Sequence, residues 1–170
     1  MSFSVYEASI PGYRRMLSNL SAILDKAEAH ALASGVDVET YAEARLAPDM
    51  RPLTAQIQMA SDSAKGGAAR LAGLEPPSFA DEETTFAELK ERIAKTIAFL
   101  DTIKPEQLEG AEGRTIEMKF PQRTMTFNGR DFLFGFSLPN FHFHVVTAYA
   151  ILRSQGVPLG KPDYLAGANA

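Results

Sequence analysis

Four segments of the chain repeat apolar residues every three or four positions, which is the spacing of one face of an α-helix. Pro11 is tolerated only in the first turn of a helix, so the first helix is predicted to start near Ser9 and to end before Gly35. A short helical turn is predicted over 38–44. The apolar face of the first helix, expected to pack on a partner helix, consists of Tyr6, Ile10, Tyr13, Leu17, Leu20, Leu24 and Ala27.

A second helix is predicted to extend to about Leu71, with Asp49 as its N-cap, because a carboxylate there can accept from the free amides of the first turn. Pro52 fits within that turn. The inner face of this helix is made of small and aliphatic residues, namely Leu53, Ile57, Ala60, Ala64, Gly67 and Leu71. These small side chains allow a neighbouring backbone to come close.

A third helix is predicted to open at Thr84 or Thr85 and to end just before Pro105. Its apolar face consists of Phe86, Leu89, Ile93, Ile97, Leu100 and Ile103. The loop over 73–82 could span at most roughly 33 Å when fully extended. A parallel and an antiparallel arrangement of the second and third helices therefore both remain open.

The period changes to two over 114–127, where polar and apolar residues alternate in two runs joined by Pro121 and Gln122, which predicts a β-hairpin. An isolated hairpin is only marginally stable in water, so its apolar side is expected to pack on the helices. Asp131 is predicted to begin the lead-in to a fourth helix, with Pro139 as a kink or restart. Alternating phenylalanines over 132–136 leave a third strand as an alternative. The chain from about 156 is predicted to be an extended tail.

Two of the three histidines lie in the fourth predicted helix. His142 and His144 are two positions apart, so in a helix they point about 200° away from each other and cannot bind one metal ion together. The alternative, a strand, would place both on one face. The helix is favoured because Phe141, His144, Ala148 and Ile151 recur at spacings of three and four. His144 is then expected to face inward, and His142 to lie on the flank near Tyr149.

Composition restricts the class of protein. The 170 residues fit one domain, 1–170. No apolar run is long enough for a membrane span. The net charge of −4, with basic residues scattered among acidic ones, argues against a nucleic-acid partner. The absence of cysteine excludes disulfides and thiolate chemistry and fits a cytoplasmic location.

The four helical segments, the hairpin and the run from Leu138 to Arg153 followed by 156–165 resemble a bacterial domain-of-unknown-function family. That family is similar to the DinB/YfiT-like four-helix bundles. The resemblance covers nearly the whole chain, including 46–50 and 64–73. It implies a mainly α-helical, DinB/YfiT-like four-helix bundle with a β-hairpin between the third and fourth helices.

DinB-like relatives typically hold a divalent metal with one histidine near the start of the second helix and two histidines one turn apart on the fourth. Some of them are thiol transferases or hydrolases. The second helix of this chain contains no histidine, and Ala148 stands four residues after His144. Since His144 alone matches a family ligand, the metal activity is not expected to transfer, and no cofactor is expected.

Two functional hypotheses follow. The first is a non-catalytic helical bundle that lacks the full metal triad and binds a small ligand, with a candidate pocket of Asp49, His142, His144 and Tyr149. The second is a DinB-like metal-dependent enzyme of thiol transferase or hydrolase type that uses His144 with Asp49 around Zn, Ni or Fe. The first is preferred, with no catalytic residue assigned and enzymatic activity left open.

A homodimer is also predicted from the fourth helix. Phe143, Val146 and Ala150 are apolar and lie beyond its inner stripe, so the core of one molecule is not expected to cover them all. His144, in contrast, is expected to be buried and bonded to a polar partner, and to be neutral near pH 7 unless that partner is a carboxylate.

Overall fold

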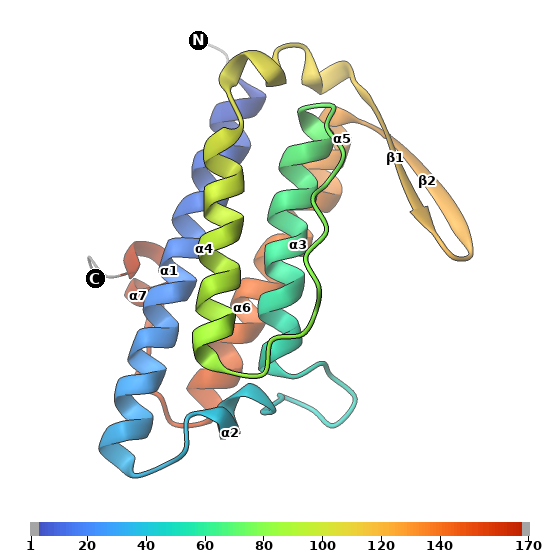
Figure 1. Cartoon of the computed structure of the whole chain (residues 1–170). Helices are drawn as coiled ribbons and strands as arrows, with labels where there is room; N and C mark the ends of the chain where they lie inside the picture. Colours follow the sequence, from blue (N-terminus) through green and yellow to red (C-terminus); the bar gives the residue numbers. More distant parts are fainter. Residues whose placement is uncertain (1–3, 168–170) are drawn as a thin grey trace.

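Four long helices pack around one core in the computed structural model, which describes residues 4–167 (Figure 1). They are α1 (Val5–Ser34), α3 (Leu53–Leu71), α4 (Phe86–Thr102) and α6 (Leu138–Ser154). Helix α3 packs on α4 and α6, and α1 completes the arrangement by packing on both. The prediction of a mainly α-helical fold with a β-hairpin between the third and fourth long helices is confirmed.

The connections between these helices contain shorter elements. Helix α2 (Glu39–Ala42) precedes α3, and two 3₁₀ turns (Pro105–Leu108 and Ala111–Gly113) lead from α4 into the hairpin. Helix α5 (Gly129–Phe132) and a π-helical segment (Leu133–Ser137) run directly into α6, and α7 (Lys161–Ala166) follows it. Among residues 4–167, no helix combines the length and the apolar composition that crossing a bilayer requires.

The predicted apolar faces form the core. Every inner-face residue predicted for α3 is buried, and so are those of α1 from Ile10 onward. Helix α1 begins at Val5, however, and the predicted start near Ser9 is wrong. Ser4 and Glu7 form a capping box, with the Glu7 amide donating to Ser4 Oγ at 3.1 Å. Pro11 is tolerated inside the helix because it lies on the exposed side, where water can reach the carbonyl that loses its partner.

The predicted role of Asp49 as the N-cap of α3 is also wrong. Asp49 lies in an exposed turn, and α3 starts at Leu53 after an extended Pro52 with ψ of 172°. A residue that precedes proline avoids the helical region, so the chain enters the helix only after Pro52. The Leu53 amide donates to the Ala44 carbonyl at 2.9 Å, which ties the start of the helix to the preceding segment.

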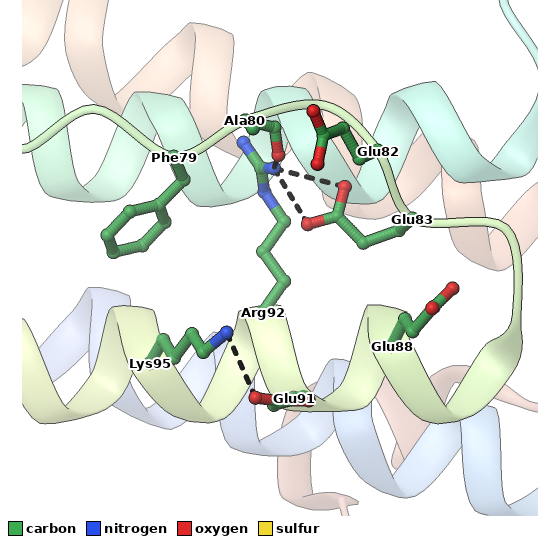
Figure 2. A pocket seen from close by; sticks show the side chains of 8 residues that line it. All are labelled: Phe79, Ala80, Glu82, Glu83, Glu88, Glu91, Arg92 and Lys95. Atoms are coloured by element: carbon green, nitrogen blue, oxygen red, sulfur yellow. Dashed lines mark hydrogen bonds and ion pairs between the residues drawn. The ribbon is translucent and has the colours of Figure 1, made fainter.

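Helices α3 and α4 run in the same direction, opposite to α1 and α6, and the segment 72–85 returns along α3 to the start of α4 (Figure 1). The parallel alternative for these two helices is therefore the one adopted. A buried arginine of α4 holds the returning segment (Figure 2). Arg92 donates to the Ala80 carbonyl at 2.8 Å and to the Glu83 carboxylate at 2.9 Å, and it pairs with Asp62 and Asp81 at 2.9 Å.

Gly67 allows a close approach of helices at the middle of the core. A Cβ at this position would collide with Ser137 Oγ and would lie 3.0 Å from the Tyr13 hydroxyl. Tyr13 and Ser137 are themselves hydrogen bonded at 2.8 Å in the buried interior. The small residues of α3 therefore admit a polar contact between α1 and the start of α6, as the prediction of a close neighbour implied.

Strands β1 (Thr115–Phe120) and β2 (Arg123–Asn128) form the predicted antiparallel hairpin, with Met118 opposite Met125. It projects from one end of the bundle (Figure 1). The alternative of a third strand over 132–136 is wrong. Asn128 Oδ1 accepts from the Asp131 amide at 2.8 Å and so starts α5 instead, as an N-cap does. The π-helical segment then carries the chain into α6, with Pro139 in the first turn.

The extended tail predicted from about residue 156 is wrong over 161–166, which form α7. Asp163 caps this helix by accepting from the Gly160 amide at 2.7 Å, and it also pairs with Lys26 of α1. Asn19 donates to the Tyr164 carbonyl at 2.8 Å. The α1 residues in these contacts are remote in sequence from α7, so no local sequence pattern could predict the contacts. Residues 168–170 of the predicted tail lie outside the described residues.

Replacing Arg92 with methionine is expected to lower the free energy of unfolding by about 2 kcal/mol, since the Glu83 carboxylate, which is only 14% exposed, loses its charged hydrogen-bond donor. Urea denaturation measures the change. Lys95→Met is the control, because Lys95 pairs with Glu91 on the exposed surface of the same helix. Such exposed pairs contribute about 1 kcal/mol or less. Equal stabilities of the two variants would contradict this role of Arg92.

Candidate functional site

A groove with a volume of about 380 Å³ lies between α3 and α6, next to the hairpin. Its walls are largely apolar and include Met59, Met118, Phe120 and Phe136. Its polar groups come from the two helices and include Ser63, Arg70, Asn140 and His144. A concave, mostly apolar surface with a few convergent polar groups is typical of a small-molecule site.

The four candidate pocket residues do not come together. His144 lines the groove, whereas Asp49 lies in the exposed turn before α3 and Tyr149 is half-buried elsewhere on α6. His142 is half-buried, and its Nδ1 lies 3.0 Å from the hydroxyl of Tyr164 in α7. Burial and the charge of Arg15 lower the pKa of His142. The angular separation predicted for the two histidines is confirmed, and His142 helps to join α7 to α6.

His144 is buried, as predicted, and its orientation is set by a glutamine of α3. Gln56 Nε2 donates to the Arg51 carbonyl at 3.1 Å, so the amide oxygen of Gln56 faces the imidazole. That oxygen lies 2.9 Å from His144 Nδ1, and an amide oxygen can only accept. The proton of the neutral ring is therefore on Nδ1. Nε2 keeps its lone pair and has no hydrogen-bond partner among residues 4–167.

Burial lowers the pKa of His144 below its ordinary value near 6.5. The nearest polar partner is the neutral amide of Gln56 rather than a carboxylate, so nothing in this contact favours the charged form. The ring is therefore neutral at pH 7, and Nε2 is available as a hydrogen-bond acceptor, a base or a metal ligand.

A second acceptor stands one helical turn before His144. Asn140 Nδ2 donates to Ser63 Oγ at 2.7 Å, and Ser63 in turn donates to the Met59 carbonyl at 2.7 Å. This series of hydrogen bonds uses the Asn140 Nδ2 group as a donor, and the Asn140 side-chain oxygen remains as an acceptor. Residues four apart lie on the same side of a helix, so α6 offers two acceptors to one groove.

The side chains in the groove do not fit the metal site of the DinB-like relatives. The partner of His144 on α3 is an amide, Gln56, and the positions one turn away on α6 are Asn140 and Ala148. Within the part of the chain that the structure describes, no three histidine, aspartate or glutamate side chains are placed so that they could hold a metal ion together. A divalent metal generally needs three or more such ligands.

Three of the polar groups were not predicted from the sequence: Gln56, Asn140 and Arg70. Gln56 carried a signal, because it is three residues from Leu53 and four from Ala60 and so lies within the inner stripe of its helix. A polar residue buried in an apolar stripe needs a partner. Asn140 carried a weaker signal, its spacing of four from His144. Arg70 carried none, since nothing in its spacing indicates that it lines a groove closed by the hairpin.

Known proteins identify the family. Residues 5–165 match the model of a domain of unknown function, DUF1993. The chain belongs to this family. It is also similar to the crystal structure of a DinB family member protein from Shewanella denitrificans, with 40% sequence identity and a TM-score of 0.88 over 95% of this chain and 92% of that chain. None of the curated proteins matches the chain. The resemblance to a domain-of-unknown-function family with a DinB-like fold is confirmed.

His144 is expected to titrate below 6.5 and to carry its neutral proton on Nδ1, as measured by ¹⁵N-edited NMR. Since its folded pKa is lowered, the unfolded chain binds more protons between the folded pKa and the ordinary value near 6.5. The contribution of His144 to stability is therefore complete above about pH 6.5 and falls as the pH drops through that window. His144→Gln should remove this part of the pH dependence. A folded pKa above 6.5 would contradict the assignment.

Proposed function

We propose that the protein binds a small amphipathic molecule in the groove between α3 and α6, with His144 Nε2 as the central polar contact. The observation that carries this proposal is a buried, neutral imidazole whose Nδ1 is held by Gln56 while Nε2 has no partner among the described residues. Nε2 is not one of the fully buried unpartnered atoms of the described residues, so it is open to the groove and can be reached by water or by a ligand. A ligand with a hydrogen-bond donor would satisfy Nε2.

The apolar walls support a ligand over an ion. Met118 and Phe120 come from the hairpin, Met59 from α3 and Phe136 from the π-helical segment, so three separate parts of the chain surround the same space. Phe136 stacks on the buried Phe132 with ring centroids 6.0 Å apart. Aromatic pairs at such separations attract each other beyond the area that they bury, which gives the groove a firm wall. A molecule with an apolar body and a polar end fits this lining.

A metal-dependent enzyme is the second candidate, because a free Nε2 is also a suitable ligand for Zn, Ni or Fe. The position of Asp49 in an exposed turn weakens this candidate, as does the amide at the α3 position beside His144. The first proposal is therefore preferred.

A fragment library screened by ¹H–¹⁵N NMR is expected to produce hits that shift the amides around Ser63, Phe136 and His144. His144→Ala should weaken these hits by about tenfold, the effect of losing one good hydrogen bond. His142→Ala is the matched control, since His142 lies on the same helix and contacts Tyr164 instead of the groove. Hits that bind both variants equally would contradict the proposal. Stoichiometric Zn²⁺ binding lost in His144→Ala and retained in His142→Ala would favour the enzyme.

We also propose that the chain forms a homodimer through the outer face of α6. Residues 132–152 contain no Asp, Glu, Lys or Arg, although Phe143 is 56% and Val146 46% exposed. The exposed Asp131 and Arg153 bound this uncharged stretch and are equidistant in sequence from His142. An antiparallel two-fold pairing that extends from α5 through the π-helical segment to the end of α6 would bring Asp131 towards the partner's Arg153, so that opposite charges meet at both ends of the surface.

Sedimentation at micromolar concentration is expected to give twice the mass of a single chain. Val146→Asp should produce the monomer, because a charge at the centre of an apolar contact is costly to desolvate. Leu32→Asp, at an 85% exposed position of α1, should leave the dimer unchanged. Arg153→Asp should weaken the dimer, and Asp131→Arg in addition should restore it. A wild-type monomer would overturn the proposal.

A further inference from the structure

We infer that the ligand of the groove is a small aromatic carboxylate that also carries a hydrogen-bond donor, and that Arg70 binds its carboxylate. This inference rests on the proposed binding function of the groove and adds the chemical class of the ligand. It starts from a cation that lines the groove and that the described part of the protein leaves unpaired.

Arg70 lies in the last turn of α3, and its side chain forms no hydrogen bond or ion pair within residues 4–167. Its guanidinium folds back over the previous turn, where a Cβ on Gly66 would lie 2.6 Å from Arg70 Nη1. Partial burial lowers the pKa of Arg70, and the charge of Glu75 partly offsets this effect. A half-buried guanidinium without a partner favours the binding of an anion, for which its planar donors are well suited.

Asp62, the only carboxylate among the described residues that line the same groove, is engaged by other cations. It accepts from Lys65 at 2.8 Å and from the buried Arg92 at 2.9 Å, and Arg92 also pairs with Asp81 and Glu83. Asp62 is therefore held by partners other than Arg70. The guanidinium of Arg70 remains as a donor at one end of the groove, and Asn140 and His144 offer acceptors.

The spacing between these groups defines the size of the ligand. Asn140 is bonded to Ser63, and the guanidinium of Arg70 lies over Gly66, three residues further along α3. At a rise of about 1.5 Å per residue, the two levels are on the order of 5 Å apart along the helix. A ligand with one aromatic ring between a donor and a carboxylate is of a size that can bridge Asn140 and Arg70, with His144 one turn beyond Asn140 on α6. Such a ring would lie against Phe136 and Met59.

The test uses two probes that differ in charge and share their shape, 4-hydroxyphenylacetate and 4-hydroxyphenylacetamide, with calorimetry at low salt and NMR to locate them. The wild-type protein is expected to bind the carboxylate about tenfold more tightly than the amide, because a charge-assisted hydrogen bond contributes at least that factor. Arg70→Gln should remove this preference and leave amide binding unchanged.

Gly66→Ala is the sharper variant, because it keeps the arginine and displaces its guanidinium from the groove; it should also reduce carboxylate binding. Lys119→Gln, an equal loss of charge at an exposed position of the hairpin, should have no effect. If both probes bind in the groove with equal affinity, the role of Arg70 is wrong while the proposed function stands. If neither probe binds but other fragments do, the inferred ligand class is wrong. If no fragment binds in the groove, the proposed function fails as well.

Discussion

A single buried guanidinium holds the architecture together. Arg92 of α4 joins Asp62 of α3 to Ala80 and Glu83 of the returning segment, so one side chain links the two parallel helices and the connection between them. Taking an arginine out of water is costly, and several acceptors at hydrogen-bonding distance offset that cost. Burial acts to raise the pKa of Glu83, but hydrogen bonds from Gln58 and Arg92 hold it below its ordinary value. With α4 fixed in this way, the opposite side of α3 is free to face α6.

The groove depends on this arrangement, and its chemistry shows how one fold can carry different sites. The α3 side chain that meets His144 is a glutamine, and Asn140 stands one turn earlier on α6. Amides orient the imidazole and accept or donate hydrogen bonds, but they are poor substitutes for the histidines and carboxylates of a metal centre. The DUF1993 chain therefore keeps a DinB-like frame, and its site has to be judged from its own side chains.

Helix α6 connects the site with the molecular surface. Its inner face supplies His144 and Asn140 to the groove, and its outer face is uncharged and partly exposed at Phe143 and Val146. The hydrogen bond between His142 and Tyr164 anchors α7 against one flank of this helix. Neighbouring residues of a helix are about 100° apart around its axis. Different side chains of α6 therefore point into the core, into the groove and towards the outer surface.

The sequence by itself determined the four apolar stripes, the hairpin and the inward direction of His144, because these follow from helical and strand periodicity, which is local. Only the tertiary structure decided where α3 begins, that 161–166 are helical and which groups meet His144. Asp49 could not cap a helix whose start is displaced by Pro52, and α7 is held by Lys26 and Asn19, far away in sequence. Gln56 and His144 are likewise brought together by packing between separate helices. The spacing of residues along the chain cannot predict such a contact.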